Sequence, residues 1–243
     1  MFAIFKREIQ SFFTAPIGYL IVGLFLLLNG LFLWVFKGDY NIFDYGFADL
    51  SNFFLLAPWI FVFLIPAITM KSFSEERKLG TLELLLIKPI SIWKVILGKF
   101  WGTCVLCLIA IVPTIIYVFA ISDLGIIPGN YDTGVVIGSY FGLLFLLSSY
   151  VSIGLFASTL SENQIVAFII GILLCFLLFN GFDAISTLFT SGDTQLQIQQ
   201  LGARAHFESI ARGIIDTRDL IYFISITLFF LYLTHVRLSR LTQ

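Results

Sequence analysis

Six stretches of the sequence contain no Asp, Glu, Lys or Arg, and each is about as long as a helix that crosses a lipid bilayer. A helix that rises about 1.5 Å per residue needs roughly 20 apolar residues to cross the hydrocarbon core. Of the 243 residues, 59% are apolar and 12% are charged, which is more apolar surface than a soluble core can bury. The six runs are Ile9–Phe36, Leu50–Met70, Phe100–Ser122, Thr133–Ser161, Asn163–Phe182 and Leu220–Val236. The sequence therefore predicts an all-α membrane protein with a bundle of six transmembrane helices.

We expect these helices to form one transmembrane domain over residues 1–243. The runs are too long and too uniformly apolar for the alternating strands of a membrane β-barrel. The expected spans are about residues 17–36, 50–70, 100–122, 134–160, 164–182 and 220–236. Three segments outside the spans have helical periodicity of their own, and they cover residues 1–16, 71–99 and 183–219.

Lys and Arg are distributed unevenly between the two sides of the predicted bundle. Ten of the 14 basic residues lie on the side that carries the N-terminal segment, the 71–99 loop and the C-terminal tail. Because basic residues favour the cytoplasmic side of a membrane, we expect both termini and this loop to be cytoplasmic. Glu162, in the turn between the fourth and fifth spans, lies on the same side, where its carboxylate can reach water. The net charge of −1 provides no basic surface for nucleic acid.

The N-terminal segment has the pattern of an amphipathic helix. Phe2, Phe5 and Ile9 recur at intervals of three or four residues. Lys6 and Arg7 take the other side. This pattern predicts an interfacial helix that lies flat on the cytoplasmic leaflet.

A second apolar stripe lies in the outer connection over 183–219. Arg204, Glu208 and Arg212 lie off the stripe. The stripe itself consists of Phe207, Ile210, Ala211 and Ile214. Its spacing predicts an outer amphipathic or re-entrant helix at the membrane boundary, and an ordinary extracellular loop is the alternative.

Small residues recur every four positions at the start of the fourth span, at Gly134, Gly138 and Gly142. Such a stripe lets another helix approach closely. We expect these glycines to serve helix packing, either within one subunit or at a dimer seam.

The sequence lacks the phosphate-binding loop that ATP hydrolysis would require. The only Gly-Lys pair is Gly98-Lys99. Trp93 stands where such a loop needs its first glycine, and Phe100 stands where it needs Ser or Thr. We therefore expect this chain not to hydrolyse ATP by itself.

Other reactive groups are few and far apart. His206 and His235, the two histidines, fall at opposite ends of the predicted bundle. Cys104 and Cys107 have the spacing of a metal or redox pair, but they lie in an apolar span, where cysteine behaves as a small hydrophobic residue. We expect a non-catalytic subunit with no cofactor or metal in this chain.

The loop over 71–99 carries the most informative local signals. Ser72 and Glu75 have the spacing of a capping box, Gly80 can end a helix, and Thr81 can begin another that Pro89 ends. The expected product is a short helix along the cytoplasmic face. It would present Glu75, Glu76, Arg77 and Glu83 to water. A solvated charge run is the alternative interpretation.

This loop resembles a known family. The stretch from Glu75 to Leu85, EERKLGTLELL, followed by Pro89 and then Gly98-Lys99, is similar to the first cytoplasmic loop of permease subunits of type II ABC exporters. The resemblance implies a coupling helix that docks on a separate ABC ATPase subunit, which would hold ATP and magnesium. The coupling residues are then Glu75, Glu76, Arg77, Gly80, Thr81, Glu83, Leu84, Leu85 and Pro89.

Two flanking stretches extend the resemblance over the whole chain. The stretches over 6–19 and 206–222 are similar to those of a subgroup that contains gliding-motility permeases. The resemblance implies a bacterial inner membrane, a second permease copy or a paralogue, contact with membrane lipid, and a role in gliding motility or protein secretion. Permeases for nitrous-oxide reductase maturation resemble the chain in the same motifs. A membrane scaffold that transmits ATPase motion without transport is a further alternative.

Overall fold

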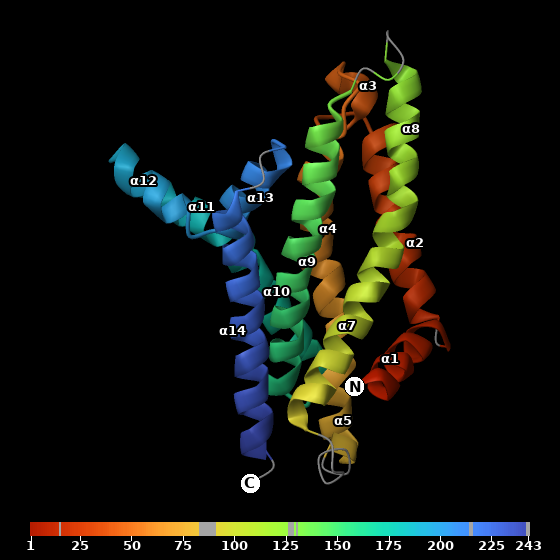
Figure 1. Cartoon of the computed structure of the whole chain (residues 1–243), viewed down its shortest axis with the longest axis vertical. Helices are drawn as coiled ribbons and strands as arrows, with labels where there is room; N and C mark the ends of the chain where they lie inside the picture. Colours follow the sequence, from red (N-terminus) through yellow and green to blue (C-terminus); the bar gives the residue numbers. More distant parts are fainter. Residues whose placement is uncertain (15, 83–90, 126–128, 130, 214–215, 242–243) are drawn as a thin grey trace.

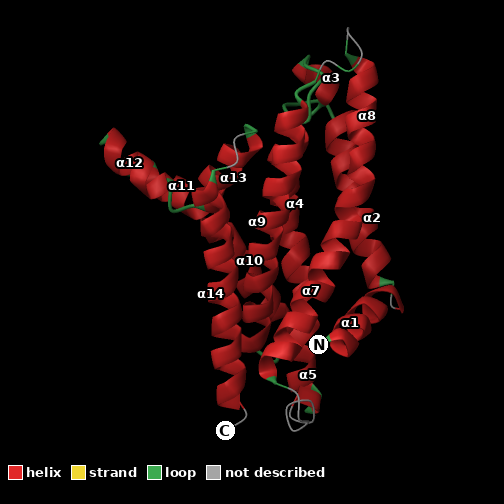
Figure 2. Cartoon of the chain, viewed as in Figure 1, coloured by secondary structure: helices red, strands yellow, loops and turns green. Residues whose placement is uncertain are grey.

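The computed structural model of the chain describes residues 1–14, 16–82, 91–125, 129, 131–213 and 216–241. Within these ranges every regular element is a helix and there is no strand (Figure 2). The helices stand side by side in an elongated bundle (Figure 1). The all-α class predicted from the sequence is therefore confirmed.

Six helices of the described residues are long and apolar enough to cross a membrane. Four of them are built from two or three helical pieces that follow one another without a loop. The first span is α2 (Ile17–Gly30) with the π-helix η1 (Leu31–Val35), and the second is α4 (Ser51–Thr69) with α5 (Lys71–Lys78). The third is α7 (Ile92–Ile111) with the 3-10 turn η2 (Val112–Thr114) and α8 (Ile115–Leu124), and the fifth is α10 (Gln164–Phe176) with the π-helix η3 (Leu177–Gly181) and α11 (Phe182–Ser186). The fourth and sixth spans are the single helices α9 (Thr133–Leu160) and α14 (Thr217–Leu241). This arrangement confirms the predicted six-helix membrane bundle.

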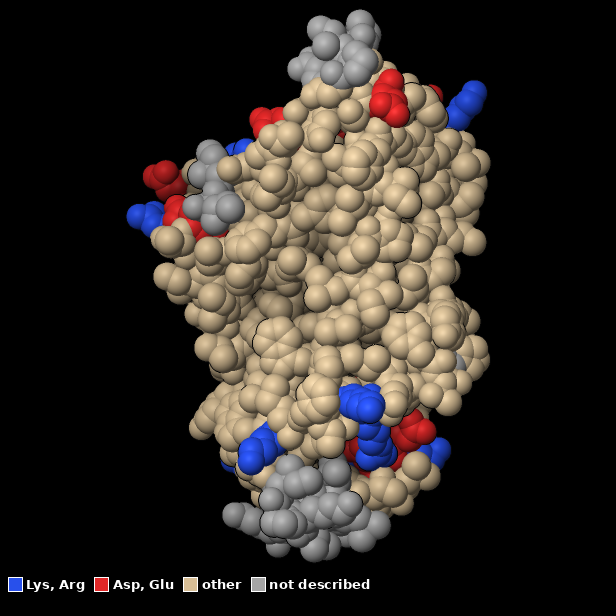
Figure 3. Space-filling view, turned by 45° about the vertical axis from the view of Figure 1, so that its right-hand side comes forward, with Lys and Arg blue, Asp and Glu red and all other residues tan. Residues whose placement is uncertain are grey.

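The two ends of the bundle differ in what they carry. The last turns of α14, together with α5 and the N-terminal helix α1 (Phe2–Thr14), lie toward one end, which we call the basal end (Figure 1). The short helices α3 (Ile42–Tyr45), α12 (Gly192–Gln199) and α13 (Ala203–Ala211) lie toward the other, which we call the distal end. On the face in Figure 3, charged side chains gather at these two ends and leave a wide uncharged band between them. Such a band suits the hydrocarbon core of a membrane.

The helices α4 and α9 form the centre of the bundle. Most of their residues are buried, whereas most residues of the other spans face outward. Gly154 of α9 lies directly against the Thr69 side chain, so that a Cβ at Gly154 would collide with it. A Cβ at Gly171 of α10 would lie 3.0 Å from the Cβ of Pro66. Small residues thus bring α4, α9 and α10 close together toward the basal end.

The second span and the basal helix form one continuous rod. The Met70 backbone is α-helical, and its amide donates to the Pro66 carbonyl at 2.8 Å. No side chain caps α5, so the predicted capping box at Ser72 and Glu75 is wrong. The reason is that α4 continues into α5 through the helical residue Met70, so that α5 has no separate N-terminus that needs a cap.

Candidate functional site

The basal helix α5 ends in a tight turn at Gly80. The Leu79 amide donates to the Glu75 carbonyl and the Gly80 amide to the Arg77 carbonyl, both at 3.0 Å. Gly80 has a φ of +66°, which favours glycine because a Cβ would be strained there. The Thr81 hydroxyl donates to the Glu76 carbonyl at 3.2 Å. The helix stop expected at Gly80 is present.

The two sides of α5 have opposite surroundings. Ser72, Phe73 and Ser74 are buried against the bundle. Glu75 and Leu79 are exposed, and Leu79 keeps 66% of its surface open. Lys78 is exposed as well, so this surface presents one carboxylate, one ammonium and one large apolar side chain at the end of the helix.

Glu76 and Arg77 are turned inward, and the prediction that both face water is wrong. The side chains of Glu76 and Arg77 are only 15% and 16% exposed. Each forms an ion pair with a residue far away in the sequence, and that attraction holds it against the bundle. Their place in the sequence gave no sign of these partners.

Arg77 ties α5 to the turn between α9 and α10. Its guanidinium donates to the Thr159 carbonyl at 2.8 Å and to the Glu162 carboxylate at 3.1 Å. The carbonyl lies at the end of α9, where helical partners run out. Arg77 thereby caps one helix while it holds another.

Among the described charged residues of the basal end, Lys99 of α7 is the most enclosed, and the sequence analysis did not predict its burial. Its side chain is 3% exposed. The ammonium donates to Glu8 Oε1 at 2.7 Å, to the Ser72 carbonyl at 2.8 Å and to Glu76 Oε1 at 3.0 Å. It also lies 5.1 Å from the centre of the Phe73 ring. Three acceptors satisfy the three donors of the ammonium, which explains how α7 can bury a lysine.

Helix α1 lies along α7 beside this cluster. A Cβ at Gly98 would lie 2.9 Å from the Cβ of Ile4, and a Cβ at Gly102 would lie 2.8 Å from the Cβ of Glu8. The glycines allow the two helices to touch, and the Glu8–Lys99 ion pair fastens them. Much of the apolar side of α1 therefore faces protein, while Lys6 and Arg7 stay exposed.

Four of the expected coupling residues, Glu83, Leu84, Leu85 and Pro89, lie outside the described residues. Ile214 of the outer stripe also lies outside them. The structure thus places Glu75, Glu76, Arg77, Gly80 and Thr81 of the coupling set together at the basal end.

At the distal end, helix α13 packs on the glycine stripe of α9. Phe207 and Ile210 are buried, and a Cβ at Gly142 would lie 3.1 Å from the Ile210 side chain. A Cβ at Gly138 would lie 2.8 Å from the Ile210 carbonyl oxygen. The glycines of α9 thus cover Phe207 and Ile210, and the place of α13 at the membrane boundary stays a prediction.

The other predicted residues of this region lie at the edges of the contact. The Ser139 hydroxyl donates to the Ala211 carbonyl at 3.2 Å. Arg212 is exposed beyond the end of α13. Gly134 lies in the first turn of α9, where its amide donates to Asp132 at 2.8 Å. Gly138 and Gly142 therefore form a seam within this subunit.

Charged residues surround α13 on its outer side. Arg204 bonds to Glu208 at 2.7 Å and to Asp183 at 3.1 Å. The hydrogen bond to Glu208 and the nearby carboxylates raise the pKa of the Arg204 guanidinium above its usual value. His206 lies 2.6 Å from Asp219 of α14. These groups line an open cavity of about 820 Å³.

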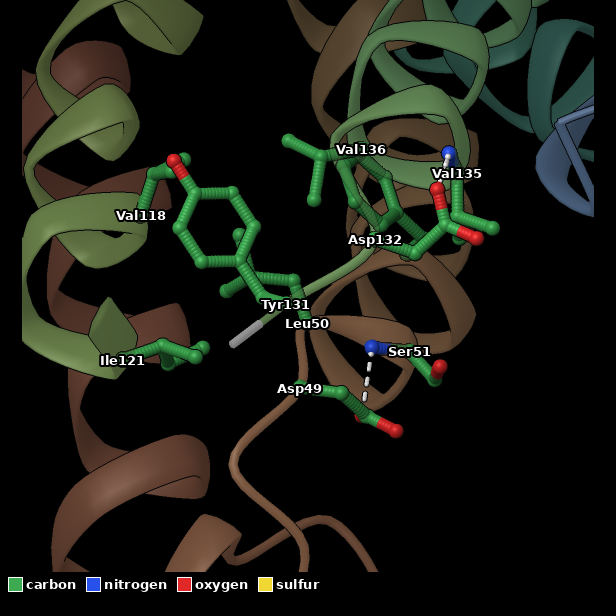
Figure 4. Close-up of a pocket in the computed structure, with 10 residues that line it drawn as sticks. Asp49, Leu50, Ser51, Val118, Ile121, Tyr131, Asp132, Val135 and Val136 are labelled. Carbon is green, nitrogen blue, oxygen red and sulfur yellow. Dashed lines mark hydrogen bonds between the residues drawn. The ribbon is translucent and has the colours of Figure 1, made fainter. Parts of the chain in front are cut away.

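A smaller cavity of about 240 Å³ lies between the first turns of α4 and α9 and the side of α8 (Figure 4). Its two carboxylates begin helices: Asp49 accepts from the Ser51 amide at 3.0 Å, and Asp132 accepts from the Val135 amide at 3.1 Å. The rest of the lining is largely apolar. Asp132 is the N-cap of α9, and Asp49 accepts from the first amide of α4, so both carboxylates have a structural use and this cavity is not the candidate site.

Among the described residues, no group of three or more His, Cys, Asp or Glu side chains is placed to hold a metal ion. Cys107 is buried and Cys104 is half-buried, and both line an apolar groove between α7, α9 and α14.

The fold and the basal end together define a class: a multi-pass helical membrane protein. In it, one span continues beyond the apolar bundle as a charged helix that ion pairs hold in place. Comparison with protein families identifies it further. Residues 2–239 match the family described as ABC-2 family transporter protein, and the chain belongs to this family. It is a membrane subunit of an ABC transporter, and such permeases in general work with an ABC ATPase. Among curated proteins, none matches the chain.

Proposed function

We propose that a separate ABC ATPase subunit docks on the exposed side of α5 and on the Gly80 turn, and drives this permease by pushing on α5. The observation that carries the proposal is the two-sided construction of α5. One side presents Glu75 and Leu79, while the other is fastened by Arg77 and Glu76. ATP and magnesium belong to the partner.

The continuity of α4 and α5 supports this role. A helix of 28 residues, Ser51–Lys78, joins the proposed docking surface to the centre of the bundle. A helix without a break transmits a displacement along its length, and this one runs on through Pro58 and Pro66, whose missing amides remove two of its backbone hydrogen bonds. A push at Leu79 therefore reaches the buried face that α4 shares with α9.

The orientation that follows places the basal end and both termini in the cytoplasm of a bacterium, with the chain in the inner membrane. Single cysteines on a cysteine-free background test it. Lys78→Cys should be protected from an impermeant maleimide added outside, and Asp193→Cys should be labelled. Both residues are exposed in the structure. Labelling of position 78 from outside would show that the protein has the opposite orientation in the membrane.

We further propose that six spans form half of a pathway, completed by a second copy or a paralogue and surrounded by lipid. The cellular role that the motifs favour is gliding motility or protein secretion, as for the gliding-motility permease GldF. A role in nitrous-oxide reductase maturation and a force-transmitting scaffold are the competing functions. Identification of the proteins and cargo that co-purify with the native complex separates these three.

Docking is tested by one charge introduced at either end. Leu79→Asp should reduce the amount of ATPase that co-purifies with the permease. Leu188→Asp is the matched control, because Leu188 is 80% exposed in the segment between α11 and α12, at the distal end. Equal recovery of the ATPase with both variants would reject α5 as the docking surface.

A further inference from the structure

At the basal end, Lys99 joins two groups of helices, which also contact each other through α7 and α9. The first group is α1 with α7, which touch along Gly98 and Gly102. The second is α5 with α9, α10 and α4, on which α5 makes its main contacts. Arg77 holds α5 to the second group through Thr159 and Glu162.

The Lys99 ammonium lies between these groups and bonds to both. Glu8 belongs to α1, and Ser72 and Glu76 belong to α5. Both carboxylates are mostly buried, with 14% of the Glu8 side chain and 15% of the Glu76 side chain exposed. The second oxygen of Glu76, Oε2, is buried and has no hydrogen-bond partner among the described residues. Two carboxylates thus share one ammonium.

Stability alone is a poor explanation for this arrangement. Taking charges out of water is costly, and well-packed apolar residues of similar volume stabilise a protein as well or better. A shared ammonium has a different property: it attracts both groups and holds their separation fixed over a short range. Any displacement of α5 then acts on α1 and α7 through charge and not only through contact.

We propose that Lys99 is a positioning residue that transmits the movement of α5 to α1 and α7. This inference rests on the proposed function, because it requires an ATPase that moves α5. It separates two neighbouring carboxylates that look alike in the sequence. Glu75 faces outward toward the partner, whereas Glu76 faces inward to Lys99.

The test compares Glu76→Ala with Glu75→Ala in the full permease–ATPase complex in lipid vesicles. Spin labels at Lys6→Cys and Lys78→Cys, on a cysteine-free background, report the separation of α1 and α5. Both positions are exposed in the structure. The separation is measured without nucleotide and with ATP plus vanadate, and the co-purified ATPase and cellular function are measured for the same variants.

In the parent complex, α1 should follow α5, so that the label separation is the same in both states. Glu76→Ala should retain the ATPase, should change the separation when ATP and vanadate are added, and should lower cellular function about tenfold, a usual size for coupling between sites. Glu75→Ala should lose ATPase and leave the separation unchanged. The inference would be overturned if Glu76→Ala had the same label separation with and without ATP plus vanadate, as the parent does, together with normal cellular function.

Two further variants guard against a folding defect. Glu8→Ala cuts the same link on the α1 side and should reproduce the separation change of Glu76→Ala. Lys99→Arg keeps the charge and the donors, so α1 should still follow α5 as in the parent complex. Failure of the parent permease to bind any ATPase would reject the proposed function. Normal ATPase binding, with no change of label separation in Glu76→Ala or Glu8→Ala, would reject only the role of Lys99.

Discussion

The basal and distal ends of the bundle both carry ion pairs, but they use them differently. At the basal end, Lys99 and Arg77 are buried or nearly so and join helices that are distant in the sequence. At the distal end, Arg204 is 37% exposed, and one of its two partners, Glu208, lies on the same helix. There the contact of α13 with α9 is made by apolar side chains against glycine. The comparison indicates that buried ion pairs join the basal helices, whereas the contact of α13 with α9 depends on shape, beside one enclosed contact of His206 with Asp219 of α14.

The largest expected effect is at Lys99. Lys99→Met leaves Glu8 and Glu76 buried without their cation, and breaking a buried pair in this way costs about 3–5 kcal/mol. We expect a clear fall in the thermal unfolding temperature of the purified protein. Lys94→Met is the control, because Lys94 is exposed on the same helix. Equal unfolding temperatures for the two variants would remove the contrast between the ends.

A methyl group at Gly138 tests the importance of shape at the distal end. A Cβ there would lie 2.8 Å from the Ile210 carbonyl oxygen, and overpacking of this kind costs about 1–3 kcal/mol. We expect Gly138→Ala to loosen α13 and to speed tryptic cleavage at Arg212. Gly30→Ala should change neither, since a Cβ at Gly30 meets nothing within 4 Å. Unchanged cleavage in both variants would contradict the assigned seam.

Gly80→Val should have a smaller effect that stays local. The φ of +66° strains a residue with a Cβ by about 1–2 kcal/mol. The turn would shift while α4 and the bundle remain folded, so we expect normal membrane insertion with less co-purified ATPase. Gly192→Val is a suitable control at the distal end, where a Cβ meets nothing within 4 Å. Full ATPase recovery with Gly80→Val would show that the shape of the turn is unimportant.

The smallest effect is expected at Arg204. Its partners are partly exposed, and exposed pairs contribute about 0.2–1 kcal/mol. Arg204→Met should therefore lower the unfolding temperature much less than Lys99→Met does. Raised salt should make the loss caused by Arg204→Met, relative to the parent protein, smaller still. A loss as large as that of Lys99→Met would show that the distal end also depends on charge.

The sequence was sufficient to predict the parts of this fold that depend on local pattern. The six spans follow from uncharged apolar runs, and the Gly80 turn follows from a glycine after a helical segment. The direction in which Glu76 and Arg77 point was not predictable, because Lys99 and Thr159 lie 23 and 82 residues away from them. One signal for Lys99 was present: a lysine at the start of an apolar run needs a partner.

The face used by α13 illustrates the same limit. The periodicity of Phe207 and Ile210 predicted an apolar side correctly, but periodicity does not say what covers it. The glycine stripe of α9 and the apolar stripe of α13 were both recognisable. Their pairing depends on how the chain returns between residues 183 and 202, which local pattern does not determine.

The central claim is that the exposed side of α5 receives the ATPase. Cross-linking in intact membranes tests it most directly, with a photoactivatable group attached to Leu79→Cys or, for comparison, to Leu188→Cys on a cysteine-free background. Illumination should join the ATPase subunit to the permease from position 79 and not from position 188. An ATPase adduct from position 188, or none from position 79 while the complex is intact, would contradict the account.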